Sequence, residues 1–257
     1  MKSITRREAL ATMGAAAVAT AAAATGLRAA GLETTDPNAS GMMANGKSSS
    51  TSMKVLLING SPRAKGNTFR MLSEIAMQLE ANGIASEIVQ IGVKPVRGCT
   101  ACGKCRANGG RCVFSDDICN GIIDKMAGAD ALIVGSPVYY GQPAGPVLSL
   151  IQRMAYAGGS TMNGKPAAAV TVCRRGGATA AFQTLQMPFQ MLNMPIVTSQ
   201  YWNIGYGASE GQVEQDEEGL QTMRTLADNM AWLLKQMATG SADRPAREPG
   251  RFTNFIK

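Results

Sequence analysis

Residues 53–68 read MKVLLINGSPRAKGNT, and this stretch decides the fold. Residues 54–59 form a short aliphatic run without polar alternation, which is typical of a parallel strand buried on both faces. The turn that follows, from Gly60 to Thr68, leads directly into a helical pattern. Such a turn offers free backbone N–H groups and the positive end of a helix dipole. The stretch therefore predicts a phosphate site between the first strand and the first helix.

Four further strand patterns alternate with helical patterns along the chain. The alternation predicts an α/β fold, a three-layer sandwich with a five-stranded parallel sheet in the order 2-1-3-4-5 and helices on both faces. The expected strands lie at 54–59, 85–91, 130–136, 167–173 and 195–201. The expected helices lie at 67–82, 117–127, 144–156, 177–192 and 216–237.

The composition excludes several kinds of catalysis. The 257 residues include no histidine, which rules out Ser–His and Cys–His nucleophile pairs, imidazole metal ligands and a histidine general base. The net charge is +7, but much of it lies in the two terminal segments, so the central region is too weakly basic to indicate nucleic-acid binding. An enzymatic activity of this chain therefore points to a cofactor.

The N-terminal segment 1–31 has the layout of an export signal. Arg6 and Arg7 precede an apolar, alanine-rich stretch at 9–24, and the pair resembles a twin-arginine motif. An amphipathic N-terminal helix is the alternative interpretation. The signal predicts export to the periplasm with no stable membrane insertion after its removal, whereas translation that begins at Met53 would leave the protein in the cytoplasm.

Two other segments are expected to lie outside the folded domain. Residues 32–52 contain almost no bulky apolar side chain, so they cannot bury enough surface to fold and are predicted to form a disordered linker. Residues 239–257 contain several arginines and prolines and are expected to form an extended tail. One folded domain is therefore predicted at 53–238.

Two later loops fall at the same edge of the predicted sheet as the turn at 60–68. Residues 135–143 read GSPVYYGQP after the third strand, and residues 174–178 read RRGGA after the fourth. Ligands of open α/β sheets bind beyond the carboxyl ends of the strands, where the strand order reverses. Tyr139 and Tyr140 suit contact with a planar ring, and the glycines allow close approach of the backbone. Ordinary loop aromatics are the alternative.

Together, the motifs at 60–68 and 135–141 resemble the NAD(P)H-dependent FMN reductase family of flavodoxin-like proteins, over roughly residues 53–238. The resemblance implies a flavodoxin-like fold, an FMN cofactor and NAD(P)H as co-substrate. It also implies that the FMN phosphate is held by Ser61, Arg63, Gly66, Asn67 and Thr68. It implies that the isoalloxazine ring lies against Pro137, Val138, Tyr139, Tyr140 and Gly141 and against Arg175, Gly176 and Gly177.

A glycine-rich loop at 98–119 follows the second expected strand and contains four closely spaced cysteines, Cys99, Cys102, Cys105 and Cys112. The same pattern marks the iron–sulfur flavoproteins of the family. This resemblance implies that the four thiolates hold a [4Fe–4S] cluster near the flavin of a neighbouring subunit. Two-residue spacers allow three thiolates to face one small cluster. The basic side chains expected to offset the negative charge are Arg97, Lys104, Arg106 and Arg111.

Three alternatives for these four cysteines remain open: a zinc site of four thiolates, disulfides in an exported protein, and a loop that holds no cluster. A zinc site would more often show two C-x-x-C pairs set well apart. Cys119 and Cys173 are expected to be small buried residues.

The sequence therefore predicts an FMN-dependent NAD(P)H oxidoreductase that passes electrons through FMN, and by way of the cluster, to a quinone, flavin, metal or iron–sulfur acceptor. The flavin carries the chemistry, so no catalytic acid or base is assigned. Expected partners are a small redox acceptor or electron-transfer protein and further copies of the chain in a homodimer or homotetramer. One alternative is a flavodoxin-like electron carrier without nicotinamide binding, although the usual acidic surface is missing. Another is a thiol-based or metal-based redox sensor, which would leave the phosphate turn unexplained.

Overall fold

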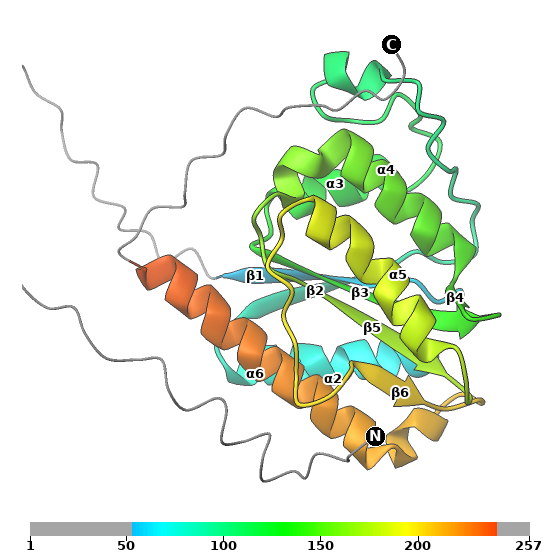
Figure 1. The fold of residues 1–257 in the computed structure, drawn as a ribbon, viewed down its shortest axis with the longest axis vertical. Helices are drawn as coiled ribbons and strands as arrows, with labels where there is room; N and C mark the ends of the chain where they lie inside the picture. The colour runs from blue at the N-terminus through cyan, green and yellow to red at the C-terminus, as the bar shows by residue number, and fades with distance from the viewer. Residues whose placement is uncertain (1–52, 241–257) are drawn as a thin grey trace, which may run out of the picture. The chain divides into compact units, whose positions relative to one another are not determined.

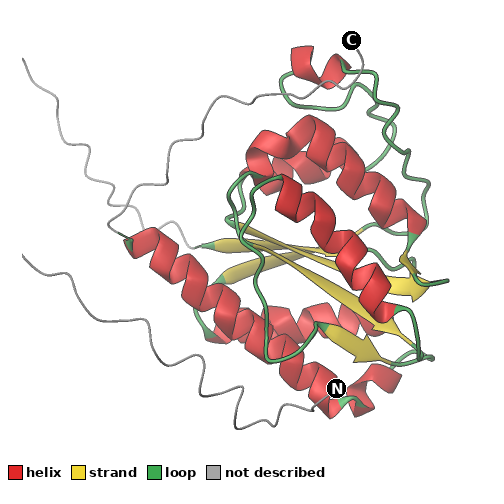
Figure 2. Cartoon of the chain, viewed as in Figure 1, coloured by secondary structure: helices red, strands yellow, loops and turns green. Residues whose placement is uncertain are grey.

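The computed structural model describes residues 53–240, which form a parallel sheet covered by helices (Figures 1 and 2). The strands pair in the order β2-β1-β3-β5-β6, all parallel, which confirms the predicted order 2-1-3-4-5. Their bounds are β1 Lys54–Asn59, β2 Ala85–Gln90, β3 Ala131–Tyr139, β5 Ala167–Cys173 and β6 Ile204–Tyr206. A two-residue strand, β4 (Gln142–Pro143), pairs antiparallel with the end of β3.

The helices cover the sheet in two layers, and Figure 1 shows α2 and α6 on the face opposite to α3, α4 and α5. The α-helices are α2 Asn67–Ala81, α3 Cys119–Ala127, α4 Gly145–Met162, α5 Ala178–Met191 and α6 Glu217–Thr239. Two short 3₁₀ helices, η1 (Lys104–Ala107) and η2 (Gln212–Gln215), lie in connecting loops. This is the flavodoxin-like three-layer sandwich that the sequence predicts.

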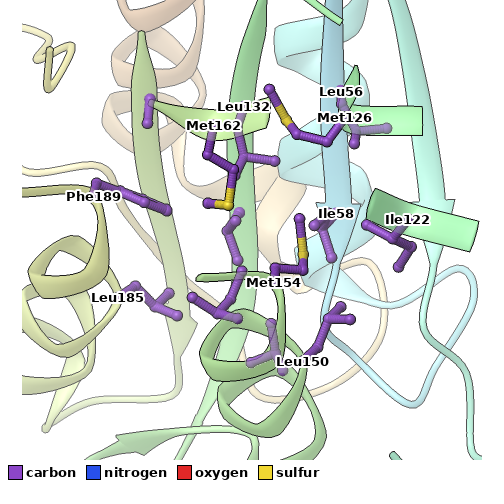
Figure 3. Packing of buried hydrophobic residues seen from close by; sticks show 14 of the residues in the cluster. Leu56, Ile58, Ile122, Met126, Leu132, Leu150, Met154, Met162, Leu185 and Phe189 are labelled. Carbon is purple, nitrogen blue, oxygen red and sulfur yellow. The ribbon is translucent and has the colours of Figure 1, made fainter. Parts of the chain in front are cut away.

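The core explains why the first strand lacks polar alternation. Leu56 and Ile58 point into the cluster formed with α3, α4 and α5, and Figure 3 shows them among methionine and leucine side chains of that layer. Val55 and Leu57 point into the opposite cluster, with α2 and α6. All four are fully buried, and burial of each stabilises the fold by about 1.5 to 3 kcal/mol. A strand with helices on both faces therefore needs apolar residues at every position.

The expectation of a strand at 195–201 is wrong. Pairing begins there with an isolated bridge from Ile196 to the start of β5, but the chain then leaves the sheet, and the regular strand is β6. The buried amide of Asn203 donates to the carbonyl oxygen of Ala169 at 3.1 Å. A side chain therefore bonds to β5 immediately before the regular pairing of β6 begins.

Two other elements extend beyond their predicted ends. β3 continues to Tyr139 and turns back as β4, a hairpin that the sequence pattern did not indicate because its turn carries tyrosine. α4 continues past residue 156 to Met162 across a kink at Gly158, whose backbone is not helical. The glycine interrupts the helical pattern in the sequence, but it packs against α3, since a Cβ on Gly158 would lie 2.9 Å from the side chain of Ile123.

Several predictions lie outside the described residues. These are the export signal at 1–31, the linker at 32–52 and nearly all of the tail at 239–257. Within residues 53–240, no helix is long and apolar enough to cross a membrane.

Candidate functional site

The register of the sheet brings the loops after four strands to one edge. Asn59 at the end of β1 pairs with Gly135 in β3, so the turn at 60–68 and the end of β3 begin at the same level. Pro137 of β3 pairs with a residue near the end of β5, and the last residues of β5 and β6 also pair with each other. In Figure 1 the parallel strands β3, β5 and β6 accordingly run toward the same edge. This edge carries all the residues predicted to contact FMN.

Hydrogen bonds from two strand ends fix the turn after β1. The backbone N–H of Ser61 donates to Oδ1 of Asn59 at 3.2 Å, and the side chain of Gln90 donates to the carbonyl oxygen of Ser61 at 2.5 Å. Oγ of Ser61 in turn accepts the N–H of Arg63 at 3.1 Å. The sequence analysis missed Asn59 and Gln90. The available signal was a polar residue at the end of each of two adjacent apolar strands.

The first turn of α2 is free to hold an anion. Gly66 is the N-cap, no described side chain caps the helix, and the first turn contains no acidic residue. Asn67 and Thr68 lie inside the helix, so neither caps it. The unused N–H groups of the first turn and the helix dipole favour a negative charge there, with the exposed side chain of Arg63 nearby in the turn.

Asn67 offers a different kind of contact from the one predicted. Its Nδ2 donates to the carbonyl oxygen of Ser209 at 2.8 Å, while its buried Oδ1 has no hydrogen-bond partner among residues 53–240. A buried acceptor without a partner is unfavourable, so the geometry suits a ligand that supplies a hydroxyl there. A ligand with both a phosphate and hydroxyl groups fits the turn.

The loop after β6 packs against the start of α2, which the sequence analysis also missed. A Cβ on Gly207 would lie 2.7 Å from Nδ2 of Asn67, so the backbone of Gly207 lies against that side chain and leaves no room for a larger residue. Asp216 anchors this loop by accepting the N–H of Tyr206 at 2.7 Å and that of Gly219 at 2.9 Å. The loop thus closes one side of the phosphate turn.

The two loops predicted to hold a planar ring are in contact. Gly177 has a φ of +84°, and a Cβ there would lie 2.7 Å from Cα of Gly141 and 3.3 Å from the side chain of Val138. Tyr140 also has a positive φ, of 51°, and its side chain is fully exposed. Strained backbone at such a loop is stabilised by its surroundings, here the β3–β4 hairpin and the facing loop.

The remaining predicted contact residues lie in these same two loops. Pro137 and Tyr139 are in the last part of β3, and the side chain of Tyr139 is about half exposed. Arg175 and Gly176 are exposed beside Gly177. The structure therefore brings all thirteen predicted cofactor contacts to one edge of the sheet, at the phosphate turn and at the paired loops.

The four cysteines of the loop at 98–119 line one small pocket. Phe114 of the loop and Arg153, Tyr156 and Ala157 of α4 complete its lining. All six cysteines of the chain are free thiols; Cys119 and Cys173 are buried, as predicted, and neither lines this pocket. No group of three or more histidine, cysteine, aspartate or glutamate side chains in the described part of the chain is arranged to hold a metal ion.

The environments of the thiols differ. A backbone hydrogen bond from Lys104 lowers the pKa of the exposed Cys102 thiol. Burial raises the pKa of Cys119 to about 11, which keeps that thiol protonated and inert. Of these two thiols, Cys102 is therefore the one that is more easily deprotonated.

Two of the basic side chains expected to offset the negative charge of the loop form ion pairs with carboxylates. Arg97 pairs with Asp116 at 2.9 Å and lies over the ring of Phe114, and Arg111 pairs with Asp124. The sequence analysis missed Arg153, whose buried side chain lines the pocket. The signal in the sequence was an arginine at a position of the helical pattern that apolar residues otherwise occupy. Burial alone would lower the pKa of Arg153, but hydrogen bonds to Cys112 and Asp117 raise it, so the group stays charged.

Comparison with known proteins agrees with this geometry. Residues 53–209 match the sequence model of the NADPH-dependent FMN reductase family. An iron-sulfur flavoprotein of Methanocaldococcus jannaschii is 32% identical over 191 residues, which are 71% of this chain and 98% of that protein. An iron-sulfur flavoprotein of Archaeoglobus fulgidus is 37% identical over 173 residues, which are 64% of this chain and 74% of that protein.

Solved structures share the fold at low sequence identity. A flavone reductase superposes with a TM-score of 0.56 at 16% identity, over 74% of this chain and 66% of that one. RosB, bound to 8-demethyl-8-formylriboflavin-5'-phosphate, superposes with a TM-score of 0.55 at 15% identity, over 80% of this chain and 98% of that one. The chain belongs to the NADPH-dependent FMN reductase family and, within it, to the iron–sulfur flavoproteins.

Proposed function

We propose that this FMN-dependent oxidoreductase takes electrons from NAD(P)H and passes them to a quinone, flavin or other redox acceptor, with a [4Fe–4S] cluster held by Cys99, Cys102, Cys105 and Cys112. The observation that carries the flavin part is the contact between Gly141 and Gly177 at the same sheet edge as the uncapped start of α2. One edge thus offers an anion site and a backbone surface suited to a planar ring.

The residues of the chain would divide the work of holding FMN. N–H groups of the first turn of α2 and the side chains of Ser61 and Arg63 would bind the phosphate, and Oδ1 of Asn67 would accept a hydrogen bond from a hydroxyl group of the ribityl chain. The loops that meet at Gly141 and Gly177 orient the ring. When bound, FMN supplies the ability to accept a hydride from a reduced nicotinamide and to return electrons to an acceptor.

The cysteine loop has almost no apolar packing of its own, and this supports the proposal of a cluster. No residue from 92 to 118 is buried, and η1 is the one regular element that this segment contains. A segment with so little apolar burial gains stability from a covalent or metal staple. The four thiols that face the shared pocket are free to supply it.

Anaerobic purification of the full-length protein tests both parts. We expect flavin absorption with a broad shoulder, about four irons and four sulfides per chain, and bleaching of the flavin bands by NADPH or NADH. Serine at each of the four loop cysteines should remove or degrade the cluster while FMN stays bound. Serine at Cys119 or Cys173 provides the matched control and should leave both groups in place.

Three results would replace parts of this proposal. Stoichiometric zinc without iron would indicate a structural thiolate site, and a disulfide within the loop after anaerobic isolation would indicate a stapled loop without metal. A flavin that dithionite reduces but NAD(P)H does not would indicate an electron carrier.

A further inference from the structure

The guanidinium of Arg153 holds both ends of the cysteine loop. Its Nη1 donates to the carbonyl oxygen of Arg97 at 3.3 Å, two residues before Cys99. Its Nη2 donates to the carbonyl oxygen of Phe114 at 2.9 Å, two residues after Cys112. One side chain of α4 therefore closes the loop, because the planar fork of arginine presents two donors in fixed directions.

Arg153 is buried with a single counter-charge. Its side chain is 1% exposed and forms an ion pair with Asp117, whose side chain is 5% exposed. Asp117 also accepts the backbone N–H of Arg97 at 3.0 Å and that of Cys119 at 3.1 Å. Most polar atoms of these two side chains have hydrogen-bond partners, but Nε of Arg153 has none among the described residues.

The two charges of the pair differ in their position relative to the thiols. Arg153 lines the cysteine pocket, whereas Asp117 is not among the lining residues of that pocket. The positive end of the buried pair therefore faces the four cysteines. Exposed arginines of the loop such as Arg97 and Arg111 act through water and are paired with surface carboxylates, so their effect on the pocket is screened.

We infer that Arg153 is a positioning residue that holds the cysteine loop closed and that its fixed charge raises the reduction potential of the group bound by the thiols. The inference rests on the proposed cluster. Each added electron makes the cluster and its four thiolates more negative, so a buried positive charge beside them favours the reduced state. The negative charge of Asp117, which does not line the pocket, acts in the opposite direction and lowers the reduction potential.

Variants of the pair give shifts of opposite sign in the midpoint potential, measured by an EPR-monitored redox titration of the anaerobically purified full-length protein. Arg153→Gln should lower the equilibrium constant for cluster reduction about tenfold, which is about 59 mV for one electron. Asp117→Asn should raise the potential, and the double variant should lie near the wild type. Arg224→Gln, which breaks an arginine–carboxylate pair on the other face of the sheet, is the matched control and should cause no shift.

A second measurement tests the closing of the loop without any cluster. Arg153→Lys keeps the charge but cannot hold two carbonyl oxygens in a fixed fork. In the cluster-free protein, hydrogen–deuterium exchange at residues 97–117 should become faster in this variant and stay unchanged in Arg224→Gln. In the loaded protein, the potential of Arg153→Lys should stay near that of the wild type.

The outcomes separate this inference from the proposed function. Shifts of the same sign in the two single variants would overturn the proposed effect on the reduction potential, and so would shifts no larger than that of Arg224→Gln. Neither result would contradict the cluster. If Arg153→Gln does not fold, the upward shift of Asp117→Asn decides the same question. A wild-type protein without iron would contradict the cluster itself, and unchanged exchange in Arg153→Lys would overturn the role in loop closure.

Discussion

Gly177 and Gly141 touch, since a Cβ added to Gly177 would lie 2.7 Å from Cα of Gly141. This contact joins the loops that follow β3 and β5, which are separated by the whole of α4 in the sequence. Neither loop alone forms the surface expected to face the flavin ring. The contact therefore fixes the position of the two loops relative to each other.

Gly177→Ala should weaken FMN binding by about tenfold, because alanine is strained at a φ of +84° by about 1 to 2 kcal/mol and its Cβ would push the facing loop away. Fluorescence titration of FMN into the apoprotein measures the loss. Gly83→Ala is the control, because φ there is also positive (+75°), a Cβ meets no atom within 4 Å, and the residue lies before β2 at the opposite edge of the sheet. Equal affinities in the two variants would contradict the role of the contact.

Replacing Asn67 and Thr68 together by alanine should weaken FMN binding by about 1 to 3 kcal/mol, the range for lost hydrogen bonds to a charged or buried group. Calorimetry with FMN measures the change. Asn82→Ala is the control, because it removes a hydrogen bond made by another asparagine side chain, at the other end of α2. It should leave the affinity for FMN unaltered. An unchanged affinity in a folded Asn67, Thr68 double variant would remove the phosphate turn from the site.

Glu74→Gln should cost about 1 to 3 kcal/mol of unfolding free energy at pH 7. Burial would raise the pKa of Glu74, but hydrogen bonds from Arg70 and Arg224 hold it below its ordinary value. Because the folded-state pKa lies below the unfolded one of about 4.3, the carboxylate stabilises the fold above that pH. The contribution is lost as the pH falls through the folded-state pKa.

Urea unfolding from pH 7 to pH 3 measures this dependence. The difference between the wild type and Glu74→Gln should shrink toward zero at the acid end. Glu80→Gln changes an exposed carboxylate on the same helix and should show a small difference throughout. A difference for Glu74→Gln that does not vary with pH would mean that the ion pairs are not its cause.

We propose that the chain is exported through the twin-arginine pathway. Changing Arg6 and Arg7 together to lysine should then leave the protein in the cytoplasm of a bacterium that has this pathway, as measured by cell fractionation. Arg28→Lys, outside the pair, should not affect export. Retention of the unaltered chain in the cytoplasm with residues 1–31 attached would show that the segment is not a signal.

The sheet and the meeting of the loops after β3 and β5 were predictable because local pattern decides them. An aliphatic run such as 54–59 has few alternatives to a buried strand, and the glycines at 176–177 allow the backbone contact that the fold makes. The fifth strand was not predictable, because the side chain of Asn203 bonds to β5 immediately before the pairing of β6 begins, and such a contact leaves no periodic signal. Apolar content at 195–201 indicated a strand where one bridge exists.

The polar supports of both sites depend on contacts that are distant in the sequence. Gln90 meets Ser61 only after β2 pairs with β1, and Arg153 meets Asp117 only after α4 packs beside α3. The motifs identify the residues that would touch the cofactors. The residues that hold those motifs in place become apparent once the tertiary contacts are known.

The lack of buried residues between 92 and 118 has a consequence for damage and repair. Figure 1 shows this segment projecting beyond α3 and α4, away from the sheet. Oxygen that destroyed a cluster there would remove none of the apolar core, so the flavin domain would survive as a functional reductase. Rebuilding the cluster would then require ordering one surface segment rather than refolding the protein, and iron and sulfide could be delivered to a chain that is already complete.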